Sequence, residues 1–280
     1  MSLFHTAMHT EHIDYWHHPG LAGIALSQAD LRQFSFDKHV HLDYHLGVVT
    51  RGGQRFIHRG SSYRLGQQGI STLNPDETHD GQSLGEEGYH VKVMSLPYSM
   101  MQALSGELGL GLVHFQAPMV EDPQLYQYFI RLHWLLTQGH CSNLAAQTHL
   151  LNFVQLTLQR HLGGPLRQAS RASGLSESQL ALCKQQFHDE PWQNYQLETL
   201  AAEVGLSKFQ FLRQFKHSTG ITPHAYLKRL RLEYAKKSLM RGDRVGQVAQ
   251  QVGFFDQSHF NKAFKQAFLV SPRQFQQRML

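Results

Sequence analysis

The pattern of apolar positions changes twice along this chain. Between residues 20 and 97, short apolar segments such as 44–49 and 55–58 alternate with glycine-rich turns. Short strands at regular spacing, separated by such turns, are typical of a β-sandwich or a β-barrel. The first part of the chain is therefore predicted to be a small β domain.

Two helices are predicted after these strands. Leucine and phenylalanine recur every three or four residues from 121 to 139, and Asp122-Pro123 supplies a cap and a first-turn proline. A second segment from 142 to 161 carries apolar residues that include Leu151, Val154 and Leu158. Glycines and a proline then end the helical pattern, and residues 164–177 are predicted to be a polar linker.

The last part of the chain, residues 178–280, contains an internal repeat. Residues 200–206 match 248–254, Phe215-Lys216 matches Phe264-Lys265, and Thr222-Pro223 matches Ser271-Pro272. In each copy a short helix is ended by a glycine, Gly205 or Gly253, which tolerates a positive φ. Ser207 or Asp256 then caps the next helix. This order predicts two helix-turn-helix units, at about 197–217 and 245–267.

A long helix is predicted between the copies, over about 223–241. At 1.5 Å per residue it spans roughly 28 Å. That length is close to one turn of DNA, about 34 Å. If this helix holds one helix-turn-helix unit at each end, the second helix of each unit would be spaced to reach successive grooves of DNA.

Charge divides along the same boundary. The chain of 280 residues has a formal net charge of +5. Residues 1–165 hold 9 Lys and Arg against 13 Asp and Glu, a net charge of −4, and residues 166–280 hold 17 against 8, a net charge of +9. Sixteen of the 20 histidines lie in the acidic part. A basic domain indicates a polyanionic partner such as nucleic acid.

One extended motif carries a family resemblance. It runs Gly253-Phe254-x-Asp256-x-Ser258-x-Phe260-x-Lys262-x-Phe264-Lys265 and closes with Ser271-Pro272-x-x-Phe275. Residues of about 180–280 resemble the AraC/XylS family of bacterial transcription regulators, which usually has Arg where Lys262 stands. The resemblance implies two helix-turn-helix subdomains joined by a long helix, both reading the major groove of promoter DNA.

The resemblance also implies which residues contact DNA. They are Phe209, Gln210, Leu212, Arg213 and Lys216 in the first copy, and Gln257, Ser258, Asn261, Lys262 and Lys265 in the second. Two alternatives stay open: Arg213 can instead form a structural salt bridge, and Phe209 can instead pack in the first helical turn. Leu212 is apolar where relatives often carry a polar residue, so either it contacts a thymine methyl group or the first subdomain reads less sequence.

The acidic part resembles the cupin-like sensor domain that often precedes this DNA-binding region. The shared pattern is His39-x-His41-x-x-Tyr44, Gly47, Gly52-Gly53, and Tyr63-x-Leu65-x-x-Gly69-x5-Pro75-x-x-x-His79. The resemblance implies a small double-stranded β-barrel with room for a small molecule, followed by two helices that commonly pair two subunits.

Four residues are expected to contact an effector: His39, His41, Tyr44 and His79. His39 and His41 are two apart and so project from one face of a strand. A cluster of imidazoles can also bind Zn, Fe or Ni. An acidic fourth ligand is not found at its usual spacing, so hydrogen bonding is preferred, and neither a metal nor a cofactor is expected.

Together these features predict an α+β protein: a cupin-like β-barrel with two dimerisation helices (1–163), a linker (164–177) and an all-α DNA-binding domain (178–280). The expected function is sequence-specific transcription regulation controlled by a small-molecule effector, with no enzyme activity. The expected partners are double-stranded promoter DNA, the effector, a second copy of the chain, and RNA polymerase if the protein activates. The alternative is a metal-dependent cupin enzyme with a helical appendage.

Localisation follows from simple exclusions. No run of about 18 apolar residues is present, so a membrane-spanning helix is not expected. The first residues lack a basic and then an apolar region, so a secretory signal is not expected either. Two cysteines make no disulfide framework, and the cytoplasm is the expected compartment.

Overall fold

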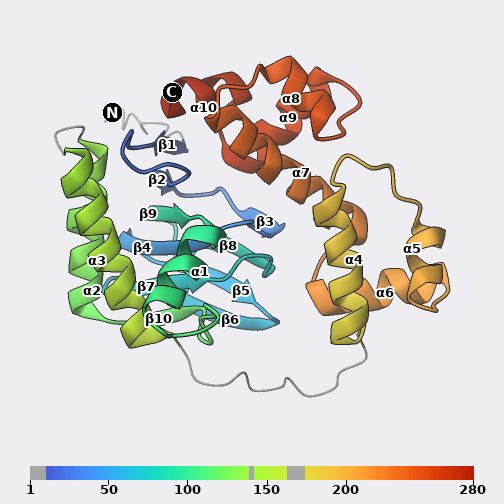
Figure 1. Cartoon of the computed structure of the whole chain (residues 1–280), viewed down its shortest axis with the longest axis horizontal. Coiled ribbons are helices and arrows are strands. Elements are labelled where there is room, and N and C mark those ends of the chain that lie inside the picture. The colour runs from blue at the N-terminus through green and yellow to red at the C-terminus, as the bar shows by residue number, and fades with distance from the viewer. Residues whose placement is uncertain (1–10, 139–141, 163–173) are drawn as a thin grey trace, which may run out of the picture.

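A computed structural model describes residues 11–138, 142–162 and 174–280, without the side chains of Leu144, Lys208 and Phe209. Strands occupy the first part of the chain and helices the second, as Figure 1 shows. This α+β architecture confirms the fold class that the sequence predicts.

The ten strands form two antiparallel sheets. The six-stranded sheet contains, in spatial order, β1 (His12–Trp16), β2 (Ala25–Leu31), β9 (Tyr89–Leu96), β4 (Tyr44–Gly52), β7 (Gly69–Leu73) and β10 (Met119–Glu121). The four-stranded sheet contains β3 (Phe36–His39), β8 (His79–Ser83), β5 (Gln54–His58) and β6 (Ser61–Leu65). Strand pairing among the described residues does not join the two sheets, so the expected barrel is an open pair of facing sheets.

Three helices cover the outer face of the six-stranded sheet: α1 (Tyr98–Glu107), α2 (Pro123–Thr137) and α3 (Asn143–His161). Leu46 and Met94 from the sheet share one core with Phe129 and Phe153 from α2 and α3. The cap predicted for α2 is present, since Asp122 Oδ1 accepts a hydrogen bond of 2.9 Å from the backbone N–H of Leu125.

The C-terminal region is helical throughout. It contains α4 (Glu177–Asp189), α5 (Leu197–Glu203), α6 (Lys208–Thr219), α7 (Pro223–Met240), α8 (Val245–Gln251), α9 (Gln257–Phe268) and α10 (Pro272–Met279). Figure 1 shows α7 running between two groups of helices, α4–α6 on one side and α8–α10 on the other. The two repeats of the sequence therefore become two separate helix-turn-helix units.

Three details differ from the sequence expectation. The strands extend beyond 20–97, because β1 begins at His12 and β10 lies at Met119–Glu121. The short helix α1 has no side-chain cap at its N-terminus and was not predicted. Leu151, placed among the apolar residues of α3, has 45% of its surface exposed.

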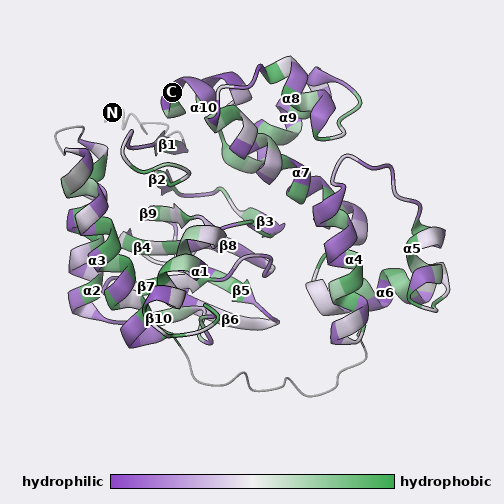
Figure 2. Cartoon of the chain, in the orientation of Figure 1, coloured by the Kyte–Doolittle hydropathy of each residue, from purple (hydrophilic) through white to green (hydrophobic). Residues whose placement is uncertain are grey.

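Apolar and polar residues are interleaved along every labelled helix of Figure 2. Among the described residues, no helix is both long and apolar enough to cross a membrane. The apolar side chains are instead used in three internal cores, one of which includes residues of the strands and of the last helices together.

Candidate nucleic-acid interface and effector pocket

The first helix-turn-helix unit is built by α5, α6 and the turn between them. Gly205 in this turn has a φ of +71°, the left-handed conformation that glycine adopts without strain. Ser207 Oγ then accepts a hydrogen bond of 3.3 Å from the backbone N–H of Gln210, and Gln210 Oε1 accepts one of 3.0 Å from that of Ser207. This reciprocal capping box fixes where α6 begins.

The second unit repeats the geometry in α8 and α9. Gly253 has a φ of +80°, and Phe254 is buried in the turn. Asp256 Oδ1 accepts a hydrogen bond of 2.7 Å from the backbone N–H of His259, which caps α9. In both units the predicted glycine adopts the left-handed conformation, and the predicted residue caps the helix that follows.

The residues predicted to contact DNA lie on α6 and α9, mostly on their solvent faces. Gln210, Arg213, Lys216, Gln257, Ser258, Lys262 and Lys265 are exposed, and Leu212 and Asn261 are partly buried. The side chain of Phe209 lies outside the described residues. The amide of Gln210 is engaged in the capping box, whereas Oδ1 of Asn261 is buried without a hydrogen-bond partner. Contact of these residues with DNA stays a prediction.

The opposite stripes of these helices are buried and aromatic. Phe211 and Phe215 on α6, and Phe260 and Phe264 on α9, have no exposed surface. An amphipathic helix whose apolar stripe is buried presents its other stripe to solvent, as a recognition helix must.

Helix α7 ties the two units together. Arg231 donates hydrogen bonds of 2.7 Å to the carbonyl oxygen of Pro191, before α5, and of 2.8 Å to that of Gly253, in the turn of the second unit. One guanidinium thus satisfies backbone acceptors next to both units, which favours a fixed spacing between them.

Part of the basic charge of the helical region pairs with carboxylates of the β domain. Lys237 lies 2.8 Å from Asp43, Lys184 lies 2.7 Å from Asp76, and Arg278 lies 3.5 Å from Asp14. In each pair the cation belongs to the helical region and the carboxylate to the β domain. The opposite net charges of the two parts therefore serve their contact with each other as well as any contact with DNA.

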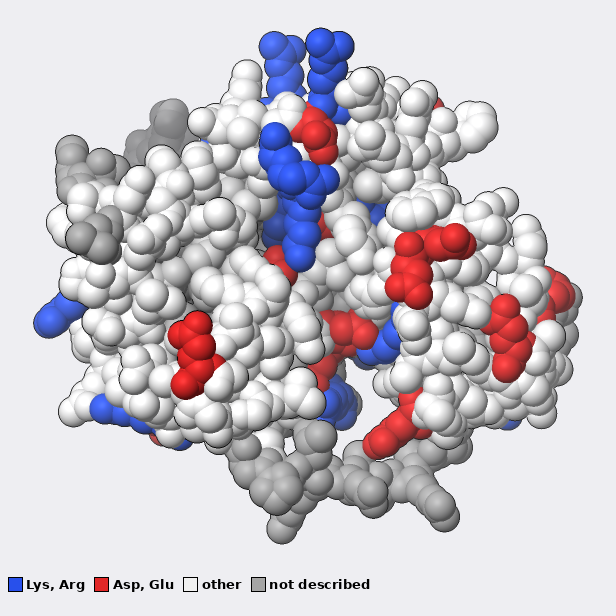
Figure 3. Space-filling model, viewed as in Figure 1, with Lys and Arg blue, Asp and Glu red and all other residues white. Residues whose placement is uncertain are grey.

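The remaining surface cations are unevenly spread. Figure 3 shows Lys and Arg gathered in a column near the top of the view, over the C-terminal helices, with Asp and Glu dominant over the group α4–α6. On this face at least, the two helix-turn-helix units differ in electrostatic character.

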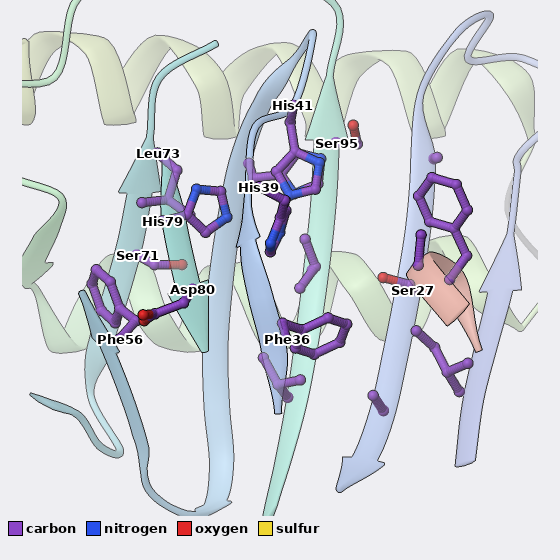
Figure 4. Close-up of a pocket in the computed structure, with 18 of the residues that line it drawn as sticks. Ser27, Phe36, His39, His41, Phe56, Ser71, Leu73, His79, Asp80 and Ser95 are labelled. Carbon is purple, nitrogen blue, oxygen red and sulfur yellow. The ribbon is translucent and has the colours of Figure 1, made fainter. Parts of the chain in front are cut away.

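A cavity of about 130 Å³ lies between the two sheets and the helical region. Figure 4 shows His39, His41 and His79 on one side of it, with Phe36 and Phe56 further along its wall. The helical region closes the cavity with Arg229 and Lys236 of α7 and Phe268 of α9. Both halves of the chain therefore line one space.

The three predicted histidines meet in this cavity. His39 Nε2 and His41 Nε2 are 3.1 Å apart, and the rings of His39 and His79 have centroids 4.4 Å apart. The strand β3 ends at His39, so His41 follows the strand rather than lying in it as expected. His41 still reaches the cluster, and its Nδ1 lies 3.0 Å from Glu233 Oε1 of α7.

Burial controls the protonation of these groups. It lowers the pKa of His39 and of His41 well below the usual value, with Arg229 adding to the effect, and it lowers the pKa of His79 to about 4. Burial by itself would raise the pKa of Glu233, but Lys236 and Arg229 outweigh it and hold that pKa below its usual value. The histidines are thus neutral and the carboxylate is charged.

Tyr44, the fourth predicted effector residue, does not line this cavity. It packs on the helix side of the sheet, where its hydroxyl donates a hydrogen bond of 2.7 Å to the carbonyl oxygen of Val113. Side chains of a strand alternate between faces, so the next residue, His45, faces the cavity instead. His45 stacks on His41 with ring centroids 3.5 Å apart.

Sequence reasoning missed His45 and the residues that the helical region contributes to the cavity, among them Arg229, Lys236 and Phe268. The alternation of β4 could have identified His45, once Tyr44 was placed toward the helices. No local signal could have identified Arg229, Lys236 or Phe268, because they reach the cavity only when the two halves of the chain pack together.

The fold and the two sites define a class of protein: a DNA-binding transcription regulator with a separate ligand-binding domain. Two family models match the chain, an AraC-like ligand-binding domain over residues 21–154 and a helix-turn-helix domain over residues 200–278. The chain belongs to the AraC/XylS family of transcription regulators, as its signature motif indicated.

Individual relatives agree with this assignment. The HTH-type transcriptional regulator YbfI of Bacillus subtilis is 28% identical over 80% of this chain and 81% of its own length. The HTH-type transcriptional activator RhaS of an Enterobacter species is 26% identical over 88% of this chain and 90% of its own. Among solved structures, an apo form of a ToxT variant from Vibrio cholerae has a TM-score of 0.58 and 15% identity over 92% of this chain and 98% of its own, which shows a shared fold.

Proposed function

We propose that this regulator binds promoter DNA through α6 and α9 and that a small molecule in the cavity controls this binding. One observation carries the proposal: the cavity of the β domain is lined on one side by α7 and α9, the helices that hold and form the expected DNA-binding units. A ligand in that space touches both halves of the chain.

The division of labour follows the sequence expectation. Residues 1–163 would sense and pair, 164–177 would link, and 178–280 would bind DNA. The DNA contacts would come from Arg213 and Lys216 of α6 and from Gln257, Lys262 and Lys265 of α9, all of which are exposed. Arginine and lysine reach both phosphates and guanine edges, and glutamine reads adenine.

An effector can control DNA binding only if it binds more tightly to one arrangement of the two halves of the chain than to another. The cavity of about 130 Å³ is smaller than the roughly 300–1,000 Å³ of sites for drug-sized ligands. A larger effector would have to displace part of the wall. ToxT, which shares this fold, has been crystallised with a bound unsaturated fatty acid, which supports a fold that accommodates small molecules.

The movable part of the wall would be α7 and α9. The strands on the other sides are held by sheet hydrogen bonds, whereas these helices meet the β domain through side chains alone, in a shared apolar core and in polar bridges such as Lys237 to Asp43. Displacing them would alter how the two helix-turn-helix units are presented to DNA.

Pairing of two chains is proposed through α2 and α3. Trp134 of α2 has 60% of its surface exposed and Leu151 of α3 has 45%, so both of these helices offer apolar surface to a partner. A dimer would raise apparent DNA affinity by effective concentration. If the protein activates, RNA polymerase is a further partner. We place the regulator in the cytoplasm and assign it no enzyme activity.

The test uses the full chain and a random DNA library. Selection should enrich one asymmetric sequence, and binding to it should weaken steeply as salt rises, because phosphate contacts release counterions. Binding that neither selects a sequence nor responds to salt would contradict the proposal. Stoichiometric iron with no DNA binding would instead support the cupin enzyme.

A further inference from the structure

Three histidine nitrogens point at one another inside the cavity. One ring nitrogen each from His39, His41 and His79 lies within 4.8 Å of the other two. All three side chains are buried. The two closest atoms, Nε2 of His39 and Nε2 of His41, are 3.1 Å apart.

The other ring nitrogens determine where the protons are. His39 Nδ1 lies 2.6 Å from the carbonyl oxygen of Asp37, and His79 Nδ1 lies 3.1 Å from that of Glu77. A carbonyl oxygen only accepts, so both Nδ1 atoms must carry the proton and donate it. His41 Nδ1 donates in the same way to the carboxylate of Glu233, at 3.0 Å.

The three Nε2 atoms are therefore left with lone pairs. A neutral imidazole has one donor and one acceptor, and in each ring the donor is already used. Two acceptors at hydrogen-bond distance repel each other unless a proton or a cation lies between them. Three lone pairs that converge within 4.8 Å of one another therefore favour a cation bound between them.

We propose that His39, His41 and His79 bind a divalent transition metal through their Nε2 atoms, and that the metal is Zn²⁺. Imidazole nitrogens suit zinc, and a histidine that binds a metal almost always donates its other N–H to a carboxylate or a backbone carbonyl. Each of these three histidines has such an acceptor in place.

The spacing fits with a small adjustment. Zinc–nitrogen bonds of about 2.0–2.1 Å at a tetrahedral angle place the nitrogens about 3.4 Å apart. The 3.1 Å between His39 and His41 is close to this value. The widest separation in the group, up to 4.8 Å, requires one ring to turn inward by up to about 1.4 Å.

Nearby charges restrict the fourth ligand. Arg229 Nη2 lies 2.9 Å from Glu233 Oε1, and Lys236 Nζ lies 3.5 Å from Glu233 Oε2, so the carboxylate offsets only one of two cations. A dication adds to this excess of positive charge. The fourth ligand is therefore an anion, such as hydroxide or a carboxylate, which Arg229 and Lys236 also attract.

The site joins the two halves of the chain. The three ligands belong to the β domain, whereas Glu233, which orients His41, belongs to α7 of the helical region. Bound metal would hold His41 in the tautomer that donates to Glu233 and so favour the packed arrangement. The metal site stands on the histidines alone and does not rest on the proposed function.

The test titrates Zn²⁺ into the full chain after chelator treatment and dialysis, followed by calorimetry. One tight equivalent is expected. His39→Ala and His79→Ala should each weaken Zn²⁺ binding by more than about 100-fold. This exceeds the roughly 10–100-fold loss that is typical when a residue that only hydrogen-bonds to a metal ligand is replaced. Glu233→Gln, which keeps the shape but removes the charge, should weaken Zn²⁺ binding about 10-fold.

His90→Ala is the matched control, because His90 is a partly buried histidine of the same domain that bonds to Thr50 instead of the cluster. Zinc binding should be unchanged in this variant. Circular dichroism of each variant shows whether it has folded. Co²⁺ bound to the wild-type chain gives a second readout, the visible absorption of a site with fewer than six ligands.

Several results would overturn the proposal. A folded wild-type chain that binds no tight equivalent, or that binds Zn²⁺ equally well without His39 or His79, has no such site. Cobalt absorption typical of six-coordinate ions would show surface binding only. DNA is absent from all these measurements, so a failure here leaves the proposed DNA binding untouched, and the reverse also holds.

Discussion

The two helix-turn-helix units share one sequence pattern but contact the β domain in different ways. The second unit is part of a continuous core in which Phe264 and Phe268 are grouped with Ile13 and Tyr15 of the first strand. The first unit has a core of its own, around Phe211 and Phe215, to which the β domain adds little more than Val40.

Polar contacts between the β domain and the helices beside the first unit, α4 and the start of α7, converge on one residue. Lys184, Tyr226 and His188 all reach Asp76, which lies in the turn before β8. A polar contact of this kind separates more readily than a shared apolar core, because water can replace its hydrogen bonds. The two repeats thus form similar helix-turn-helix units, of which only the second shares an extensive apolar core with the β domain.

The backbone at the helix ends also differs. Helix α6 ends at Gly220, whose φ is +79°, as expected for a left-handed cap. Helix α9 ends at Leu269, which adopts a φ of +62° without being glycine. Leu269 packs partly against the shared core, and this burial offsets the strain of the left-handed conformation.

The largest effect is expected to be the same in both units. Phe215→Ala and Phe264→Ala should each lower the free energy of unfolding by about 3–5 kcal/mol, because each ring is fully buried and contacts three other aromatic rings. Denaturant titration measures the change. A large effect in only one unit would mean that the other contributes little to the cooperative transition.

Substitution of the turn glycines should lower the free energy of unfolding by different amounts in the two units. A Cβ at Gly253 would lie 2.8 Å from the carbonyl oxygen of Trp192, whereas a Cβ at Gly205 would meet no atom within 4 Å. Gly205→Ala should therefore cost about 1–2 kcal/mol, for the left-handed backbone alone. Gly253→Ala should cost about 2–4 kcal/mol, since backbone must also shift. Equal losses in thermal or denaturant unfolding would contradict the crowding at the second turn.

Removal of one exposed cation from each unit should weaken DNA binding. Arg213→Ala and Lys262→Ala are each expected to lower affinity for the selected site by about 1–3 kcal/mol if the side chain reads a base. Fluorescence anisotropy on the selected and on scrambled DNA measures the change. A matched control is Arg64→Ala, which removes an exposed cation of the β domain. An equal loss on scrambled DNA would assign the residue to phosphate contact only.

The smallest expected effects concern the helix caps. Ser207→Ala and Asp256→Ala each remove a side-chain acceptor of a backbone N–H at the start of a recognition helix. Each should lower stability by about 1 kcal/mol. In Ser207→Ala the Gln210 side chain keeps its hydrogen bond from the backbone N–H of position 207, so only one half of the capping box is lost. No measurable change in unfolding for either variant would argue against a stabilising cap.

Local signals in the sequence were sufficient for the helical region. Gly205, Ser207 and Thr222, with their counterparts in the second copy, set the ends of helices through backbone conformation and hydrogen bonds a few residues away. Such interactions depend on neighbouring residues only. The predicted boundaries of these helices therefore agree with the structure to within one or two residues.

The cavity was harder to predict because its walls are distant in the chain. The cupin-like pattern points to His39, His41 and His79, which do meet in the cavity, but Tyr44, expected beside them, packs toward the helices. Neighbouring residues of a strand point to opposite faces of the sheet, so a shift of one residue along the strand moves a side chain to the other face. Only the pleat of β4 as folded shows that His45 faces the cavity.

The sequence by itself determined the order of strands and helices, the duplicated reader and the opposite charges of its two halves. The tertiary structure decided that these charges meet, at Asp43 and Lys237 for example, and that Glu233 lies against His41. His41 and Glu233 are 192 residues apart, and no local propensity specifies a contact over that separation. It forms because packing α7 against the sheets buries apolar surface and leaves each buried charge beside a partner.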